Sequence, residues 1–238
     1  MKLLIRFSIV LFITMTYITH ACATWSIIII DAKTKKIGIA GASCTYCVYG
    51  IGAIAPGKGA IVVQAMSNNS ARAKGLEMIQ ADIDPEKILN AIKDPVYDPE
   101  EQQYAIVCIN NIKKPVVYTG KLTTPSKGAL TANGISVQGN TLADSMELSA
   151  VLKAALAAQK ENLSIEEVLM KALEAGAQLG GDKRCGERKA ASAFLTVAKP
   201  DDDPKKPYIN LIVLGNNESI NAVKALRKKF NDWKSQSH

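Results

Sequence analysis

The chain has 238 residues, of which 47% are apolar and 21% charged, as in an ordinary globular protein with a sizeable core. A formal net charge of +7 and a pI near 9.1 would suit anionic partners. However, aromatic residues make up only 5% and do not alternate with basic ones, so the composition argues against nucleic-acid binding. The basic residues gathered at 224–234 fit the solvated face of a C-terminal helix better.

The start of the chain has the three parts of a secretory signal peptide. Lys2 and Arg6 supply a charged beginning, residues 7–18 form an apolar run, and Ala21 and Ala23 satisfy the A-x-A cleavage pattern. A retained membrane anchor fits less well, because a membrane span needs ~20 apolar residues. These features predict that the chain is exported and cut after Ala23.

Cleavage at that point would divide the chain into a signal peptide at residues 1–23 and a single domain at residues 24–238. Besides a retained anchor, lipidation at Cys22 is a second alternative to cleavage after Ala23, but the residues before Cys22 make a poor lipidation signal. We expect a secreted or periplasmic protein with no stable membrane span after cleavage. The mature chain would begin with Thr24, which would then carry a free α-amine next to its hydroxyl.

The mature chain keeps Cys44, Cys47, Cys108 and Cys185. Four cysteines in an exported protein favour structural disulfides, and three pairings are open. Cys44 and Cys47 have the C-x-x-C spacing of a redox or zinc half-site, but no second C-x-x-C exists. Because His238 is the only mature histidine, we expect no metal site, and we expect no cofactor.

The first half of the domain predicts strands joined by turns and by two short helices. Four consecutive isoleucines at 27–30 make the first strand strongly β-forming, and the polar turn at 31–36 makes it half of a hairpin. Ser67, Asn68 and Asn69 can cap the helix that follows the third strand. Strands are expected at 25–31, 37–43, 60–66, 103–110 and 115–119, and helices at 71–81 and 86–93.

The second half contains two long helices between strands. Ser164 and Glu167 have the order of a capping box at the start of the second of these helices, and the glycine-rich segment 180–184 ends it. Residues 120–131 are expected to form a polar connection. Strands are expected at 133–140, 190–198 and 208–214, and helices at 142–160, 165–179 and 221–233.

Strand pairs and helix pairs are segregated along the chain, which favours an α+β fold with antiparallel sheets over alternating βαβ units. Two packed sheets with helices outside would form a four-layer αββα sandwich. The order of elements permits this architecture without requiring it.

Several short motifs occur together and in order along residues 24–233, nearly the whole mature chain. The most specific are Thr24-Trp25-Ser26, Gln138-Gly139-Asn140 and Gly180-Gly181-Asp182. Together they resemble the domain-of-unknown-function 1028 family, which is described as similar to N-terminal-nucleophile hydrolases. The resemblance implies the αββα sandwich, and it implies an exported branch of the family in which Cys44 pairs with Cys185.

The resemblance also implies a mechanism, in which the Thr24 hydroxyl attacks a carbonyl and the Thr24 α-amine accepts its proton. An α-amine has an ordinary pKa of ~7.7–8.0, so a useful fraction is neutral near pH 7. Asn140 is the candidate oxyanion donor. Asp182 and Arg184 are candidates to orient the amine or to bind a substrate carboxylate.

Each of these residues also has a structural interpretation. Asn140 would cap the helix that follows it, Asp182 and Arg184 would pair in a turn, and Gln64 would satisfy a buried strand end. The expected substrate is a small-molecule or peptide-like amide. A non-catalytic secreted binding module on the same scaffold is the second hypothesis, and a redox protein using Cys44 and Cys47 is the third.

Overall fold

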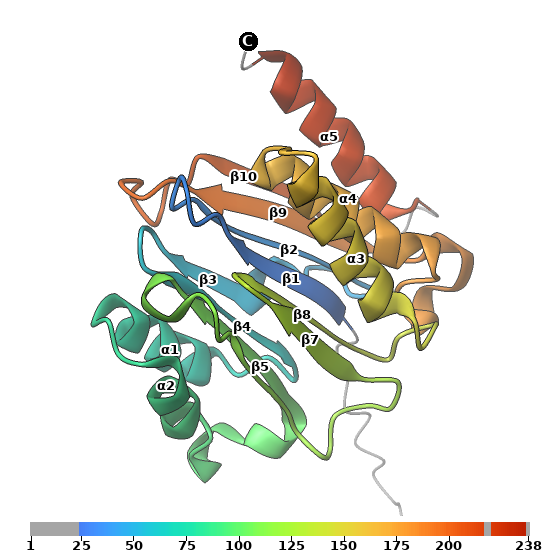
Figure 1. Cartoon of the computed structure of the whole chain (residues 1–238). Helices are drawn as coiled ribbons and strands as arrows, with labels where there is room; N and C mark the ends of the chain where they lie inside the picture. Colours follow the sequence, from blue (N-terminus) through green and yellow to red (C-terminus); the bar gives the residue numbers. More distant parts are fainter. Residues whose placement is uncertain (1–23, 217–219, 237–238) are drawn as a thin grey trace, which may run out of the picture.

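The computed structural model describes residues 24–216 and 220–236, so the expected signal peptide lies outside the described residues. These residues form an α+β protein built on two antiparallel sheets (Figure 1). This confirms the α+β class and the antiparallel sheets that the order of strands and helices predicts.

The larger sheet grows from the N-terminal hairpin. β1 (Thr24–Ile30) and β2 (Ile37–Ser43) pair along their whole length, because β-branched residues suit strands and the polar segment between them turns the chain. This sheet has the order β10-β9-β2-β1-β8-β7. Its other members are β7 (Gly128–Ala132), β8 (Ile135–Asn140), β9 (Ser192–Ala198) and β10 (Ile209–Val213).

The smaller sheet has the order β3-β4-β5-β6 and is also antiparallel throughout. Its two central strands are buried along their whole length. Its members are β3 (Gly52–Ala55), β4 (Gly59–Ala65), β5 (Gln102–Cys108) and β6 (Val116–Thr119).

Two helices, α1 (Asn69–Gln80) and α2 (Pro85–Ile92), pack on the smaller sheet. As predicted, Asn68 caps α1 by accepting a hydrogen bond from the Ala71 amide, 3.0 Å away. Three other helices cover the larger sheet (Figure 1). They are α3 (Glu147–Lys160), α4 (Ile165–Gln178) and α5 (Ala222–Gln236).

Side chains along a strand point alternately to the two faces of the sheet, and this divides the core into layers. On β1, Trp25, Ile27 and Ile29 belong to the apolar cluster under α3, α4 and α5. Ile28 and Ile30 face the other way, and they join a second cluster that also contains residues of β4 and β5. One face of the larger sheet therefore packs against one face of the smaller sheet.

Several expectations about these elements need correction, among them the helix expected at 142–160, which begins only at Glu147. The sequence predicts no strand at residues 50–59 and a connection at residues 120–131. The structure instead has β3 in the first segment and most of β7 in the second. The capping box at α4 is also wrong, since the Ser164 side chain makes no capping hydrogen bond. Glu167 instead accepts a hydrogen bond at 2.7 Å from Arg227 of α5.

Candidate active site

The layer between the sheets changes from apolar to polar at one end. Side chains two residues apart on a strand share a face, so Thr24 and Ser26 lie on the same face of β1 as Ile28. The neighbouring strands show the same change, and the polar residues concerned are all buried. We call this set the polar cluster: Thr24, Ser26, Ser43, Gln64, Gln103, Ser136, Gln138 and Asn140.

Gln103, at the second position of β5, connects the two sheets within the polar cluster. Its Oε1 accepts hydrogen bonds from Asn140 Nδ2 at 2.9 Å and from Gln64 Nε2 at 3.0 Å. Its Nε2 donates to the Gly139 carbonyl at 3.0 Å. Since buried amides are costly unless paired, these bonds fix Gln64 and Asn140 relative to each other.

A second chain of hydrogen bonds runs beside the first. The Ser26 hydroxyl donates to Gln64 Oε1 at 2.6 Å and accepts from Gln138 Nε2 at 2.6 Å. Gln138 Oε1 in turn accepts from the Ser136 hydroxyl at 2.8 Å. The polar cluster is therefore largely satisfied by its own members.

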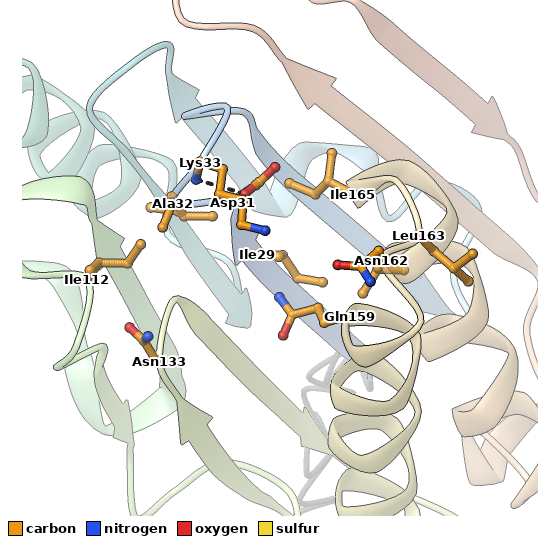
Figure 2. A pocket seen from close by; sticks show the side chains of 12 residues that line it. Ile29, Asp31, Ala32, Lys33, Ile112, Asn133, Gln159, Asn162, Leu163 and Ile165 are labelled. Carbon is orange, nitrogen blue, oxygen red and sulfur yellow. Dashed lines mark hydrogen bonds between the residues drawn. The ribbon is translucent and has the colours of Figure 1, made fainter.

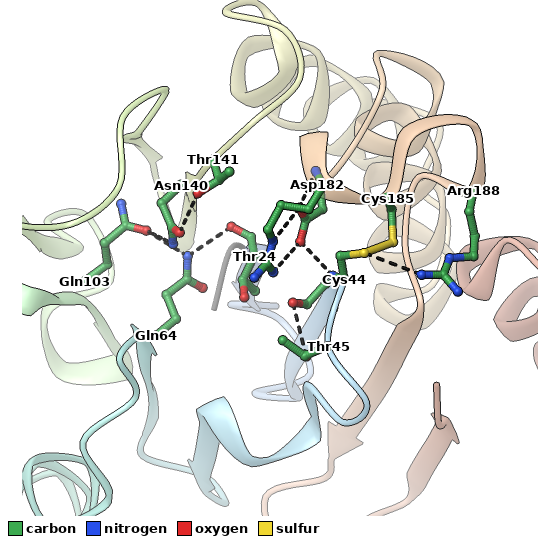
Figure 3. A network of polar contacts seen from close by, with 12 residues as sticks. Thr24, Cys44, Thr45, Gln64, Gln103, Asn140, Thr141, Asp182, Cys185 and Arg188 are labelled. Carbon is green, nitrogen blue, oxygen red and sulfur yellow. Dashed lines mark hydrogen bonds and ion pairs between the residues drawn. A yellow bond between two sulfur atoms is a disulfide. The ribbon is translucent and has the colours of Figure 1, made fainter. Parts of the chain in front are cut away.

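Thr24 lies at the edge of this cluster. It pairs with Ser43 of β2 on one side and with Asn140 of β8 on the other, and its carbonyl accepts from Gln64 Nε2 at 3.4 Å. Its exposed fraction is 1%. Figure 3 shows Thr24 between Gln64 and Asn140 on one side and Asp182 and Cys44 on the other. The structure thus brings these expected residues together.

Asp182 is fully buried and begins the short 3-10 helix Lys183–Arg188. One carboxylate oxygen accepts from the Cys44 amide at 2.6 Å and from Arg184 Nη2 at 2.8 Å. The other accepts from the Arg184 amide at 3.0 Å and from its Nε at 3.1 Å. Asp182 and Arg184 therefore pair, as the structural interpretation expected. Because Cys44 follows the strand partner of Thr24, this pair is also held next to the candidate nucleophile.

A disulfide closes this side of the site. Cys44 and Cys185 are bonded, with Cα atoms 5.5 Å apart and a sequence separation of 141 positions, which confirms the pairing implied by the resemblance. Arg188 Nη2 lies 3.6 Å from Cys44 Sγ. Cys47, at the surface, and Cys108, in the core, are free thiols.

The state of these cysteines removes the support for the redox interpretation, which required Cys44 to bond with Cys47. Burial raises the pKa of Cys108 to about 12, so this thiol stays protonated and unreactive near neutral pH. Within residues 24–216 and 220–236, no group of three or more histidine, cysteine or acidic residues is arranged to hold a metal ion.

Three non-glycine residues beside the site have left-handed backbone conformations. Ala65 follows Gln64 with φ 70°, and Thr141 follows Asn140 with φ 53°. Lys189, with φ 66°, accepts a hydrogen bond from the Asp182 amide at 3.0 Å. Such conformations cost of order 1–3 kcal/mol each and concentrate at functional sites.

Sequence reasoning missed Gln103, Ser26 and Gln138. The sequence did contain a signal for these three residues. Each lies on a predicted strand, two positions from a residue whose side chain faces the other sheet, so its own side chain faces that sheet too. The capping interpretation of Asn140 is wrong, because α3 begins at Glu147 and the Asn140 amide bonds to Gln103 instead.

Fold and site together define an α+β protein with a buried polar cluster at one end of two packed antiparallel sheets. The chain belongs to the family of unknown function DUF1028, whose model matches residues 24–223. The crystal structure of protein SPO2555 from Silicibacter pomeroyi, described with the same family model, is similar. It has 24% sequence identity and a TM-score of 0.73, with 88% of each chain covered. A search of curated proteins found no match.

Proposed function

We propose that the protein is an exported amidohydrolase of the N-terminal-nucleophile type, in which removal of residues 1–23 turns Thr24 into the nucleophile. One observation carries this proposal. Thr24 starts a central strand at the polar end of the layer between the sheets, with Gln64 and Asn140 on one side and Asp182 on the other.

The arrangement of layers supports the same assignment. Helices α1 and α2 lie outside the smaller sheet, α3 to α5 lie outside the larger one, and the sheets pack on each other. We interpret this as the four-layer αββα sandwich of N-terminal-nucleophile hydrolases. The disulfide supports export, because disulfides persist in oxidising compartments. No helix within residues 24–216 and 220–236 is long and apolar enough to cross a membrane.

In the proposed reaction, the Thr24 hydroxyl attacks the amide carbonyl and its proton passes to the Thr24 α-amine. The α-amine then gives this proton to the leaving amine as the C–N bond breaks, and water hydrolyses the ester left on Thr24. Asn140 Nδ2 has two hydrogens, of which one bonds to Gln103. The second is the candidate donor to the oxyanion. Asp182 positions the end of β2 through the Cys44 amide. The Arg184 side chain, 34% exposed, is the candidate partner of a substrate carboxylate.

The test uses the mature protein that begins at Thr24 and a panel of amino-acid and dipeptide p-nitroanilides. Thr24→Ala should lower the hydrolysis rate by about 10³-fold or more, because it removes the nucleophile. Thr24→Ser should keep part of the activity, since it retains a hydroxyl. Thr131→Ala, on exposed β7, is the matched control and should hydrolyse at the wild-type rate. Equal rates for wild type and Thr24→Ala would reject the proposal.

A second candidate, a non-catalytic binding module, is favoured by the 1% exposed fraction of Thr24. It predicts that the α-amine of the mature protein stays inaccessible. An amine-reactive reagent applied at pH 7 to the mature protein distinguishes the two. Rapid, selective labelling of Thr24 supports the hydrolase, and protection of Thr24 while surface lysines react supports the binding module.

A further inference from the structure

A cavity of about 400 Å³ lies at the opposite end of β1 from Thr24. It is formed where β1 ends, beside the turn at residues 31–36, the β7–β8 turn and the α3–α4 connection (Figure 2). A strand rises ~3.3 Å per residue, so about 20 Å separates this cavity from the candidate active site. Its size falls in the range of small-molecule sites, ~300–1,000 Å³.

The floor of the cavity is the edge of the hydrophobic core. Ile29, Ile165 and Val168 are buried members of the cluster under the helices, and Leu163 packs against it. These aliphatic side chains offer a surface on which an aliphatic group of a ligand would be removed from water.

The walls are held by backbone hydrogen bonds, so the cavity is preformed. The Ile30 amide donates to the Gly134 carbonyl at 2.8 Å, and the Gly134 amide donates to the Ile112 carbonyl at 2.8 Å. Gly134 has φ 70°, and a Cβ there would lie 2.8 Å from the Ile30 carbonyl oxygen, so only glycine allows this close approach. On the other wall, the Leu163 amide donates to the Ala158 carbonyl at 3.2 Å.

The polar lining consists mainly of side-chain amides. Asn133, Gln159 and Asn162 surround the hollow (Figure 2), and none of these three amides has a hydrogen-bond partner among the described residues. Each offers one acceptor and two donor hydrogens, the groups that a peptide bond needs. The charged residues of the lining, Asp31 and Lys33, stand two positions apart on the turn.

Asp31 remains ionised at this place. Partial burial by itself would raise its pKa, but hydrogen bonds from the Thr34 hydroxyl and from the Lys33 and Thr34 amides outweigh that effect and lower the pKa. The carboxylate accepts from the Lys33 amide at 2.9 Å and from the Thr34 hydroxyl at 2.6 Å. A carboxylate has about four acceptor positions, which leaves capacity for a ligand ammonium.

We propose that this cavity binds a short, free peptide with an aliphatic side chain. The side chain would lie on Ile29 and Ile165, and the peptide amide would pair with Gln159 and Asn162. The amino terminus would bind Asp31, and the carboxylate would bind Lys33 through charge-assisted hydrogen bonds. The lining holds one cation and no aromatic ring, which disfavours polyphosphates and ligands that stack on aromatic rings.

The test is isothermal titration of the full-length chain with the dipeptide Ala-Leu and with N-acetyl-Ala-Leu-amide. We expect saturable one-to-one binding of Ala-Leu and at least tenfold weaker binding of the blocked form. Gln159→Ala should weaken Ala-Leu binding by about 3–10-fold, and Asp31→Asn should reduce the difference in affinity between Ala-Leu and the blocked form. Lys160→Ala, the exposed neighbour that does not line the cavity, should bind as wild type.

The proposal is overturned if Ala-Leu does not bind saturably up to 10 mM, or if Gln159→Ala binds it as tightly as wild type. Binding of maltose in place of Ala-Leu would also overturn it, in favour of a carbohydrate site. Thr24→Ala should leave Ala-Leu binding unchanged. Loss of binding in that variant would place the peptide at the candidate active site and not in this cavity.

Discussion

Glu147, the first residue of α3, is a carboxyl group fully removed from solvent, and neither of its oxygens has a hydrogen-bond partner among the described residues. Burial raises its pKa from 4.5 to about 9; the nearby backbone amides of Ala143 and Gly181 act in the opposite direction, and the carboxylates of Asp182 and Asp144 act in the same direction as burial. The side chain is therefore protonated at neutral pH, which spares the site a second buried negative charge next to Asp182.

This protonation makes stability depend on pH. Between about pH 4.5 and 9, the folded state holds one proton on Glu147 that the unfolded state has lost. The contribution of Glu147 to stability is thus complete below pH 4.5 and is lost as the pH rises toward 9, at about 1.4 kcal/mol per pH unit. Glu147→Gln, which mimics the neutral acid, should remove this slope.

Urea denaturation at pH 5, 6.5 and 8 measures the effect as the free energy of unfolding. The wild-type value should fall with pH more steeply than the Glu147→Gln value, so the variant should be the more stable protein at pH 8. Glu86→Gln on α2 is the surface control. Parallel slopes for wild type and Glu147→Gln would show that Glu147 is already ionised in the folded state.

Among the elements, α4 packs closely against β1 at Gly176. The Trp25 indole donates a hydrogen bond to the Leu173 carbonyl at 3.3 Å, and a Cβ at Gly176 would overlap the indole nitrogen. Gly176→Ala should therefore destabilise the protein by about 1–3 kcal/mol, even though alanine is the better helix former by ~1 kcal/mol. The free energy of unfolding in urea measures this change.

Gly50→Ala is the matched control for Gly176→Ala, because a Cβ at Gly50 would meet no atom within 4 Å. It should change stability by less than about 1 kcal/mol. If Gly176→Ala were as stable as this control, Trp25 would have room to move, and the close packing of α4 on β1 would not limit stability.

The disulfide links β2 to the 3-10 helix that carries Arg184. Replacing both Cys44 and Cys185 by serine should lower the stability of the folded protein by about 2–5 kcal/mol, because the bond closes a long loop. It should also increase hydrogen exchange at residues 182–189, since Asp182 would then be held to β2 by the Cys44 amide alone. Thermal unfolding and hydrogen-exchange mass spectrometry measure these two effects.

Cys47→Ser is the control for the disulfide, as it changes a free, exposed thiol. It should unfold at the wild-type temperature. An unchanged exchange rate at residues 182–189 in the double serine variant would mean that the hydrogen bonds of Asp182 suffice to hold this loop.

At the scale of the whole molecule, the proposed function depends on where the chain is cut. Only cleavage directly before Thr24 places an α-amine next to the Thr24 hydroxyl at the polar end of the two sheets. N-terminal sequencing of the exported protein should read Thr-Trp-Ser. A protein that retains Ala23 should fold with the same circular dichroism spectrum but should lose the hydrolysis of p-nitroanilides, because its Thr24 nitrogen is an amide.

The comparison for this prediction is the mature protein made by in-vitro removal of a fusion partner directly before Thr24. Equal activity of the two forms would show that another group acts as the base. A mature terminus at any other residue would contradict the maturation step itself.

The amino-acid sequence was sufficient for features that depend on neighbouring residues. The isoleucine run and the polar turn predicted the β1–β2 hairpin, Asn68 predicted the cap of α1, and the segregated strands and helices predicted an α+β fold. These features are local because backbone geometry and side-chain alternation act over a few residues. The cleavage pattern before Thr24 is local in the same way, and the role of Thr24 as nucleophile that it suggests stays a proposal.

Only the tertiary structure decided the rest. β3 and β7 are edge strands with partly exposed side chains, so each is defined by its one neighbour and not by an apolar pattern of its own. Gln103 joins residues of both sheets, and Asp182 bonds to the amide of Cys44, 138 positions away. Such contacts depend on how the sheets and loops pack against each other. The positions of these residues along the chain do not indicate which of them will meet.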